Sequence, residues 1–369
     1  MKTRNRWLLA IPFVALGIAL AFLFYTLVPK EANGPTADAK PLATYLPADA
    51  LTTGGGVFYT DYRLLRQTIT TTTATNGALL EFIQKASPFD LSSSLFQLFN
   101  TPDLAQEVKL DWQQLQESAW IPWIPLEIVR GSFDWTTFKT TLKNEGYAEE
   151  TSGQALLYNA PYFESNRFAY LGQLAIQGDV LVMEHYSPPL EATLTRTDIL
   201  KAFNGTATTV AQTPAWAAFA SSLQGVPSFY LGPAPAAPGA EALVALDPTT
   251  TATNFLEKSR ERAKYFLSPS FLDFAAFPDM AEKGKVTFLL RYQDEKSAAA
   301  DKNMIENGMS ASYSLVFPGE TFLSLLGAPQ VTQEGSFLRV VTHSQNGIKI
   351  LQAFVQNRDF GFLYQEVAE

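Results

Sequence analysis

Two histidines are the residues in this chain best suited to metal or proton-transfer chemistry. The chain has no cysteine, so a zinc site would need both His185 and His343 together with carboxylates, and neither histidine lies in an HExxH pattern. In strand register, His343 shares a face with Phe337 and Val341. Both histidines are therefore interpreted as partly packed strand residues, and the sequence predicts no metal ligands.

Serine and carboxylate chemistry has little support in the pattern. No serine lies in GxSxG, and SxxK does not occur. A Ser–His–acid triad stays open, because such triads are defined by geometry. Glu149-Glu150 and Asp294-Glu295 lie at predicted turns and caps, which favours solvated charges. A glycosidase-type carboxylate pair also stays open, because its separation is a three-dimensional quantity. The sequence names no catalytic residue.

Nucleotide-binding signals are missing from the sequence. Neither GxxxxGK[ST] nor GxGxxG occurs. Gly54-Gly55-Gly56 precedes the strand-like VFYTDY instead of joining a strand to a helix. We interpret the glycines as a flexible lead-in to the first strand, and no cofactor is predicted.

Tryptophans form the densest aromatic group. Trp112 is followed by Trp120 and Trp123, and the last two flank a proline in a stiff stretch. Large rings with a polar handle are favoured at interfaces, so these three could form a platform for a glycan or a protein partner. The alternative is that they cover one end of the core.

Composition narrows the class of protein. The chain has 369 residues, 47% of them apolar and 17% charged, which excludes a disordered chain. A net charge of -9 makes binding to nucleic acid through phosphate contacts unfavourable. The absence of cysteine excludes disulfides and the lipidated cysteine of a bacterial lipoprotein.

Residues 7–29 predict a transmembrane helix. They form a run of 23 residues without a charge, and a bilayer core of about 30 Å needs about 20 apolar residues. Lys2, Arg4 and Arg6 precede the run, which places residues 1–6 in the cytoplasm and the rest outside. The predicted location is the cell membrane, with a single pass. A cleaved signal peptide is the alternative, with Ala37-Asp38-Ala39 as the nearest small-x-small site.

The outer part divides by composition into a tether and two folded halves. Residues 30–44 combine Pro, Gly and mixed charges without periodicity, as in a tether. Residues 45–231 and 243–369 carry alternating strand and helix patterns. The stretch 232–242 (GPAPAAPGAEA) between them fits an inter-domain linker or a long loop within one domain.

Several elements follow from local patterns. A strand over 128–133 precedes Asp134 at an N-cap position and a helix that Gly146 ends. The runs 168–176 and 180–186 flank Gly178-Asp179 as a hairpin. In the second half, Asp294 caps a helix over 295–307 that Gly308 ends, and a last helix presents Ile350, Leu351, Phe354 and Val355 on one face.

The order of these elements predicts an α+β fold. Each half reads strand, acidic cap, helix, glycine and then another strand, which fits either two related halves or a chance similarity. The predicted architecture is a mainly antiparallel sheet, or two such sheets, with helices packed on one face.

A resemblance adds to this interpretation. YLPADA at 45–50, RGSFDWTTFKTTLKNEGY at 130–147 and RDFGFLY at 358–364 resemble segments of uncharacterised bacterial envelope proteins with one N-terminal anchor and an outer α+β domain. The resemblance implies a bacterial, membrane-anchored, extracytoplasmic protein. It implies no catalytic residue.

The sequence therefore favours a non-enzymatic envelope protein. Residues 7–29 would hold it in the membrane. Its outer domain would bind a protein partner or an envelope polymer, or act as an accessory subunit of a membrane complex. Two alternatives stay open. One is a membrane-tethered hydrolase that uses carboxylates on a glycan or peptide, and the other is a small-ligand or lipid carrier.

Overall fold

The structure is a computed structural model that describes most residues of the unit Pro41–Glu369. The described residues are 41–52, 55–69, 76–86, 111–121, 126–160, 171–184, 196–234, 271–311, 314, 316–344, 346–357 and 359–360. The predicted transmembrane segment, 7–29, lies outside them. Within these ranges, no helix is both long enough and apolar enough to traverse a bilayer.

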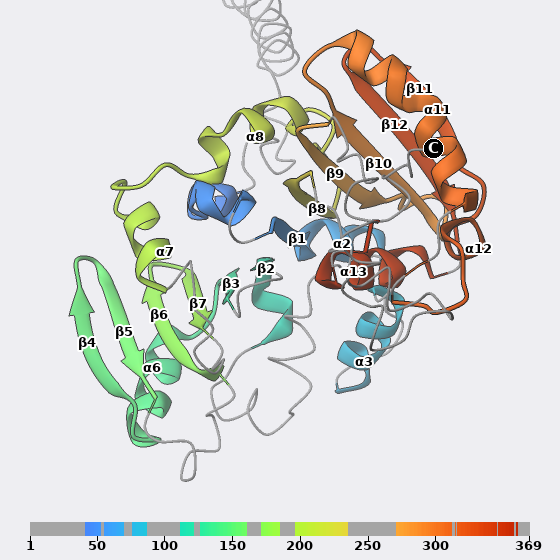
Figure 1. Ribbon diagram of the computed structural model, residues 1–369. Helices are drawn as coiled ribbons and strands as arrows, with labels where there is room; N and C mark the ends of the chain where they lie inside the picture. The colour runs from blue at the N-terminus through green and yellow to red at the C-terminus, as the bar shows by residue number, and fades with distance from the viewer. Residues whose placement is uncertain are drawn as a thin grey trace, which may run out of the picture. The chain divides into compact units, whose positions relative to one another are not determined.

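One antiparallel sheet runs through the unit (Figure 1). Every neighbouring pair of its strands is antiparallel. The twelve described strands, in the order in which they lie across the sheet, are β11 (Gln330–Glu334), β12 (Phe337–His343), β10 (Lys285–Arg291), β9 (Asp273–Pro278), β8 (Ser228–Pro233), β1 (Val57–Asp61), β2 (Leu115–Ile121), β3 (Leu126–Gly131), β7 (Val180–Glu184), β6 (Gln173–Gln177), β5 (Ala155–Asn159) and β4 (Ala148–Ser152).

The sheet joins the two halves that composition separates. β8 pairs with β1 from the first half and with β9 from the second. The proposed linker begins inside β8, since Gly232 and Pro233 are strand residues, and 235–242 lie outside the described residues. The halves therefore share one sheet within one compact unit.

Helices cover both faces of this sheet, which corrects the expectation of helices on one face. Val180 and Val182 of β7 belong to one apolar cluster, whereas Leu181 and Met183 of the same strand belong to another. Because neighbouring strand residues point to opposite faces, these clusters lie on opposite sides. We call the side of Val180 the first face and the side of Leu181 the second face.

The first face is covered by α7 (Arg196–Phe203), α8 (Pro214–Phe219) and the 3-10 turns η1 (Pro41–Thr44), η2 (Ala48–Leu51) and η6 (Val210–Gln212). Two clusters share the second face. Their helices are α2 (Tyr62–Thr68), α3 (Asn76–Ala86), α6 (Trp135–Asn144), α11 (Glu295–Ala311), α12 (Phe322–Leu326) and α13 (Gly347–Asn357).

Helix starts follow the predicted caps closely. Asp134 Oδ1 accepts the N–H of Thr137 at 3.0 Å, and Asp294 Oδ1 accepts that of Ser297 at 2.8 Å. Gly308, however, does not end its helix, because α11 continues to Ala311. Met309 is fully buried in the same cluster as Ile305, so packing outweighs the low helix propensity of the glycine.

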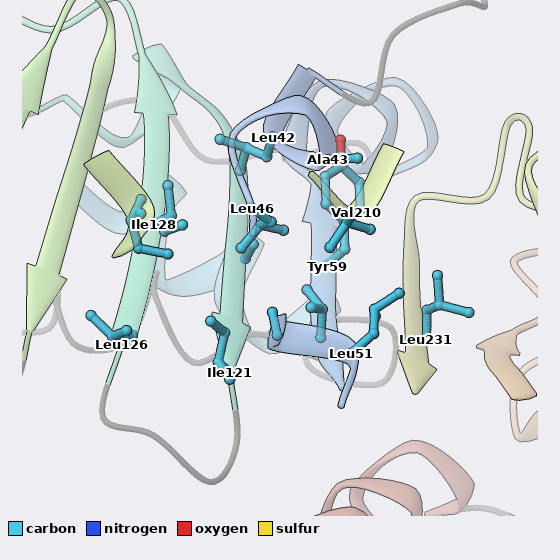
Figure 2. Packing of buried hydrophobic residues seen from close by; sticks show 14 of the residues in the cluster. Leu42, Ala43, Leu46, Leu51, Tyr59, Ile121, Leu126, Ile128, Val210 and Leu231 are labelled. Atoms are coloured by element: carbon cyan, nitrogen blue, oxygen red, sulfur yellow. The ribbon is translucent and has the colours of Figure 1, made fainter. Parts of the chain in front are cut away.

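The compact unit starts at Pro41, inside the range expected to be tether. Leu42 and Leu46 are buried against the first face, where Tyr59 and Ile121 present their side chains (Figure 2). A bridge between Pro47 and Thr209 fastens the same segment to the turn before α8. Pro41–Thr44, which the sequence assigned to the tether, therefore belongs to the folded unit.

Candidate functional site

The candidate site is built around Glu117, a glutamate with no solvent exposure in the middle strand β2. A β-bulge between Leu115 and Glu117 shifts the register of β2 against β3. Leu115 packs in a cluster on the second face, whereas Ala119 packs on the first. The bulge thus turns Glu117 to the first face, which is a common effect of an inserted residue.

Asp61 lies directly opposite Glu117 and begins α2. The two residues are Cα partners in the β1–β2 ladder. Asp61 Oδ1 accepts the N–H groups of Arg63 at 3.0 Å and of Leu64 at 3.2 Å, which is an N-cap arrangement. The carboxylates of Asp61 and Glu117 are therefore held side by side where β1 ends and α2 begins.

Arg63 joins these two carboxylates. Its Nη2 lies 2.9 Å from Asp61 Oδ2 and 2.5 Å from Glu117 Oε1, and its Nε donates to Asp61 Oδ1 at 3.2 Å. The planar guanidinium can donate several hydrogen bonds at once, which suits it to bridge two acids.

A second arginine links Glu117 to the surface. Arg130 Nη1 lies 3.3 Å from Glu117 Oε1, and its Nε donates to Asp179 Oδ2 at 2.7 Å. Asp179 is half-exposed in the β6–β7 turn. The remaining oxygen, Glu117 Oε2, accepts the backbone N–H of Leu42 at 3.4 Å. We call Asp61, Arg63, Glu117, Arg130 and Asp179 the carboxylate–arginine network.

Burial shifts the protonation equilibria in this network. Desolvation raises the pKa of Glu117 above its usual value, although Arg63 and Arg130 oppose the shift. Burial also raises the pKa of the neighbouring Tyr59 well above 10.0, and the charges of Glu117 and Asp61 add to this shift. Tyr59 therefore stays neutral at physiological pH.

The geometry of the network fits a structural role better than a catalytic one. A general acid or base must reach a substrate proton, but Glu117 is fully enclosed and Asp61 is only 4% exposed. Both carboxylates are also occupied by the same guanidinium. The network instead ties together the leading turn η1, three central strands and the start of α2.

The predicted tryptophan platform is divided between two regions. Trp112 lies in η3 (Trp112–Gln114) and packs on Phe82 of α3, with ring centroids 4.9 Å apart. Trp120 lies near the other end of β2 and stacks on Phe58 at 5.3 Å and 11°. Each is half-buried against a different cluster, so the fold does not bring these two together. Trp123 lies outside the described residues.

Of the two histidines, His185 lies outside the described residues, and His343 ends β12. His343 Nδ1 is 3.1 Å from Glu282 Oε1 on the surface. Across the described ranges, no group of three or more His, Asp or Glu residues is arranged to hold a metal ion.

Glu149 and Glu150 lie on opposite faces of the edge strand β4, and all five residues from Ala148 to Ser152 keep solvent contact. Hydrogen bonds from Lys143 and Tyr158 lower the pKa of Glu149. Gly55 and Gly56 lie between η2 and β1, and the N–H of Gly56 donates to the Ala50 carbonyl at 2.9 Å. The Tyr230 hydroxyl donates to the Gly55 carbonyl at 2.6 Å, and Gly56 has a φ of +100°.

Sequence reasoning missed the network because its members are far apart in the chain. Arg63 and Glu117 are separated by 54 positions. The only local signal was Glu117 itself, an acidic residue between Leu115 and Ala119 in a stretch that can form a strand.

Comparisons with known proteins do not assign the chain to a family. No protein-family profile matches it, and no curated protein matches its sequence. A solved structure described as crystal form I of TP0453 is similar at 9% identity and a TM-score of 0.41, covering 86% of this chain and 99% of that one.

Proposed function

We propose that the chain is a single-pass, membrane-anchored protein of a bacterial envelope. Its outer domain, residues 41–369, would act as a binding or accessory module without enzymatic activity. The observation that carries this proposal is the uncharged run 7–29, which follows three basic residues and precedes the compact unit.

The packing of the leading segment supports a close attachment. Leu42 is fully buried, so the connection between the apolar run and the folded domain can be no longer than residues 30–41. An extended chain spans at most about 3.5 Å per residue, which limits this tether to about 40 Å. An outer domain on so short a tether would act on partners in or near the same membrane.

The geometry of the network argues against hydrolysis by this pair of acids. A glycosidase-type site needs one carboxyl group that donates a proton and another that is open to water or substrate. Asp61 and Glu117 are neighbours, but Arg63 occupies both and neither faces solvent. These acids are therefore assigned to the structure of the domain.

Alkaline carbonate extraction of membranes tests the anchor. We expect the wild-type chain to stay in the membrane pellet. Replacing Leu16 and Leu20 by Arg places two charges near the bilayer centre at about 3 kcal/mol each, so this variant should be lost from the pellet. The matched variant, with Phe at both positions, should remain. An Arg variant that is retained as fully as wild type would exclude this anchor.

The intact mass of the membrane-bound protein tests the signal-peptide alternative. We expect a mass near the 40.6 kDa of the full chain. A chain that begins after Ala39 would establish cleavage and contradict the anchor.

Affinity purification in a mild detergent tests the accessory role. A reproducible, stoichiometric partner is the expected result. A clean monomer would contradict the accessory role and favour the hydrolase or carrier alternatives.

A further inference from the structure

Among the described strands, β4 forms one edge of the sheet (Figure 1), and its side chains on both faces keep solvent contact. Ala148, Glu149, Glu150 and Thr151 are all exposed, and β4 contributes no side chain to the three apolar clusters. Its described strand neighbour is β5 alone. β4 is therefore held mainly by its backbone pairing.

The hairpin register shows which backbone groups face outward. Ser152 and Ala155 are partners on either side of the two-residue turn Gly153-Gln154. Such a closing pair is hydrogen-bonded, and bonded and non-bonded pairs alternate along an antiparallel ladder. Glu150 therefore bonds to β5, whereas Glu149 and Thr151 direct their N–H and C=O groups to the open edge.

The opposite edge of the sheet, β11, packs against α11. Val331 of β11 is buried in the cluster that contains Ile305 and Met309 of α11. Gln333 Nε2 also donates to the carbonyl of Glu295, the first residue of α11, at 2.9 Å. Among the described residues no helix packs on β4 in this way. Glu149 forms an ion pair with Lys143 of α6 at 2.8 Å, and Glu150 interacts electrostatically with Arg196 of α7.

The charge of β4 selects among possible occupants. The strand AEETS carries two acids and no base. β4 could also pair with β4 of a second copy of the chain. If the antiparallel pair were centred on Glu149 or Glu150, that glutamate would lie directly opposite its own copy, and such like charges are destabilising. Within the described part of the chain, no cation lies within ion-pair distance of Glu150, and Arg196 interacts with it only at longer range. An added strand with Lys or Arg opposite Glu150 would form hydrogen bonds with the outward N–H and C=O groups of Glu149 and Thr151. Its cation would also attract the Glu150 carboxylate.

We propose that β4 is a docking edge for an extended, basic segment of another polypeptide, which adds to the sheet as a further antiparallel strand. This inference rests on the binding role proposed above and specifies the partner as a basic strand. Backbone hydrogen bonds at Glu149 and Thr151 would supply affinity, and Glu150 would favour a basic partner.

Binding of synthetic peptides to the full-length chain in a neutral detergent tests the inference. The probe is a labelled peptide of alternating lysine and valine, and two controls are its glutamate–valine counterpart and a lysine–valine peptide with N-methylated backbone amides. We expect only the first to bind, with slower hydrogen exchange at the amides of Glu149 and Thr151.

Variants separate strand addition from simple charge attraction. Thr151→Pro removes an N–H that points away from β5, so no bond to β5 is lost. Proline is also tolerated at the edges of sheets. Thr151→Pro should weaken binding at least tenfold, whereas Thr151→Val should leave it within twofold. Glu150→Gln should weaken binding severalfold and reduce its dependence on salt.

The inference would be overturned if the lysine–valine peptide did not bind, or if the N-methylated or glutamate peptide bound equally well. It would also be overturned if the chain formed a dimer through β4, which a loss of dimerisation in Thr151→Pro would reveal. If the proline variant does not fold, the N-methylated peptide provides the same test. Failure here leaves the carbonate and mass results unaffected, so it is distinguishable from failure of the anchor.

Discussion

Arg63 Nη2 lies 2.5 Å from Oε1 of Glu117, a residue 54 positions away and fully buried. This contact joins the first turn of α2 to the middle of the sheet. Because Glu117 Oε2 also accepts the N–H of Leu42, one carboxylate connects the sheet, the first helix and the segment that follows the tether. The network therefore links the first residues of the folded unit to its central strands.

Removing Arg63 should be costly. Among the described residues, Arg63→Ala leaves the buried Glu117 with one guanidinium partner, Arg130 at 3.3 Å. Breaking a buried ion pair costs about 3 kcal/mol. The matched control is Arg339→Ala, which removes an exposed pair with Glu334 and should cost less than about 1 kcal/mol. Urea denaturation of both variants measures the difference. Equal losses would show that the network does not stabilise the fold.

The pH dependence of stability should carry the signature of Glu117. Its pKa is raised by burial above the usual 4.5, so the folded state binds the proton more tightly than the unfolded state. This contribution to stability is present below the unfolded pKa and is lost as pH rises through the folded pKa. Glu117→Gln removes the titration.

The free energy of unfolding of Glu117→Gln, minus that of wild type, should therefore increase from pH 4 to pH 7. Taking this difference cancels the titration of groups that both proteins share. A difference that decreases over the same range would mean that the pKa of Glu117 is lowered in the folded protein.

Gly56 should not tolerate a side chain. Its φ is +100°, and an added Cβ would lie 2.5 Å from the hydroxyl oxygen of Tyr230, whose ring is buried between Phe58 and Phe274. Gly56→Ala should cost more than about 2 kcal/mol, from strain and overpacking. Gly178→Ala is the control, because Gly178 has a φ of +60° and nothing within 4 Å. Its cost should be about 1 kcal/mol, and thermal denaturation would compare the two.

Arg196 should hold α7 on the sheet. Its Nη1 donates to the Leu174 carbonyl at 2.9 Å, and its Nη2 donates to Asn159 Oδ1 at 2.9 Å. A lysine ammonium cannot reproduce this fork. Arg196→Lys should therefore speed hydrogen exchange in α7 about tenfold while exchange in α6 stays unchanged. Equal acceleration in both helices would indicate a global loss of stability instead.

Local patterns were sufficient for elements that show alternation and caps. The hairpin of β6 and β7 around Gly178 and the helix after Asp134 were both predicted within a few residues. β4 and β11 were missed because AEETS and QVTQE have no apolar alternation. Edge strands bury little, so their sequences carry little signal.

The layering was predicted wrongly for an identifiable reason. Strands such as VFYTD and VLVME are apolar at consecutive positions, which is typical of strands buried on both faces. That pattern indicated helices on both sides, whereas the prediction placed them on one. The network could not be predicted at all, since its ion pairs depend on strand order and on the bulge before Glu117.

Labelling of single introduced cysteines tests the proposed topology most directly. The chain has no cysteine of its own, so each introduced thiol is the only target. Thr3→Cys lies before the apolar run, and Ser222→Cys lies at an exposed position of the folded unit. With a membrane-impermeant maleimide on intact spheroplasts, we expect Ser222→Cys to be labelled at once and Thr3→Cys only after permeabilisation. Labelling of Thr3→Cys alone, or of neither before permeabilisation, would contradict the anchored extracytoplasmic protein proposed here.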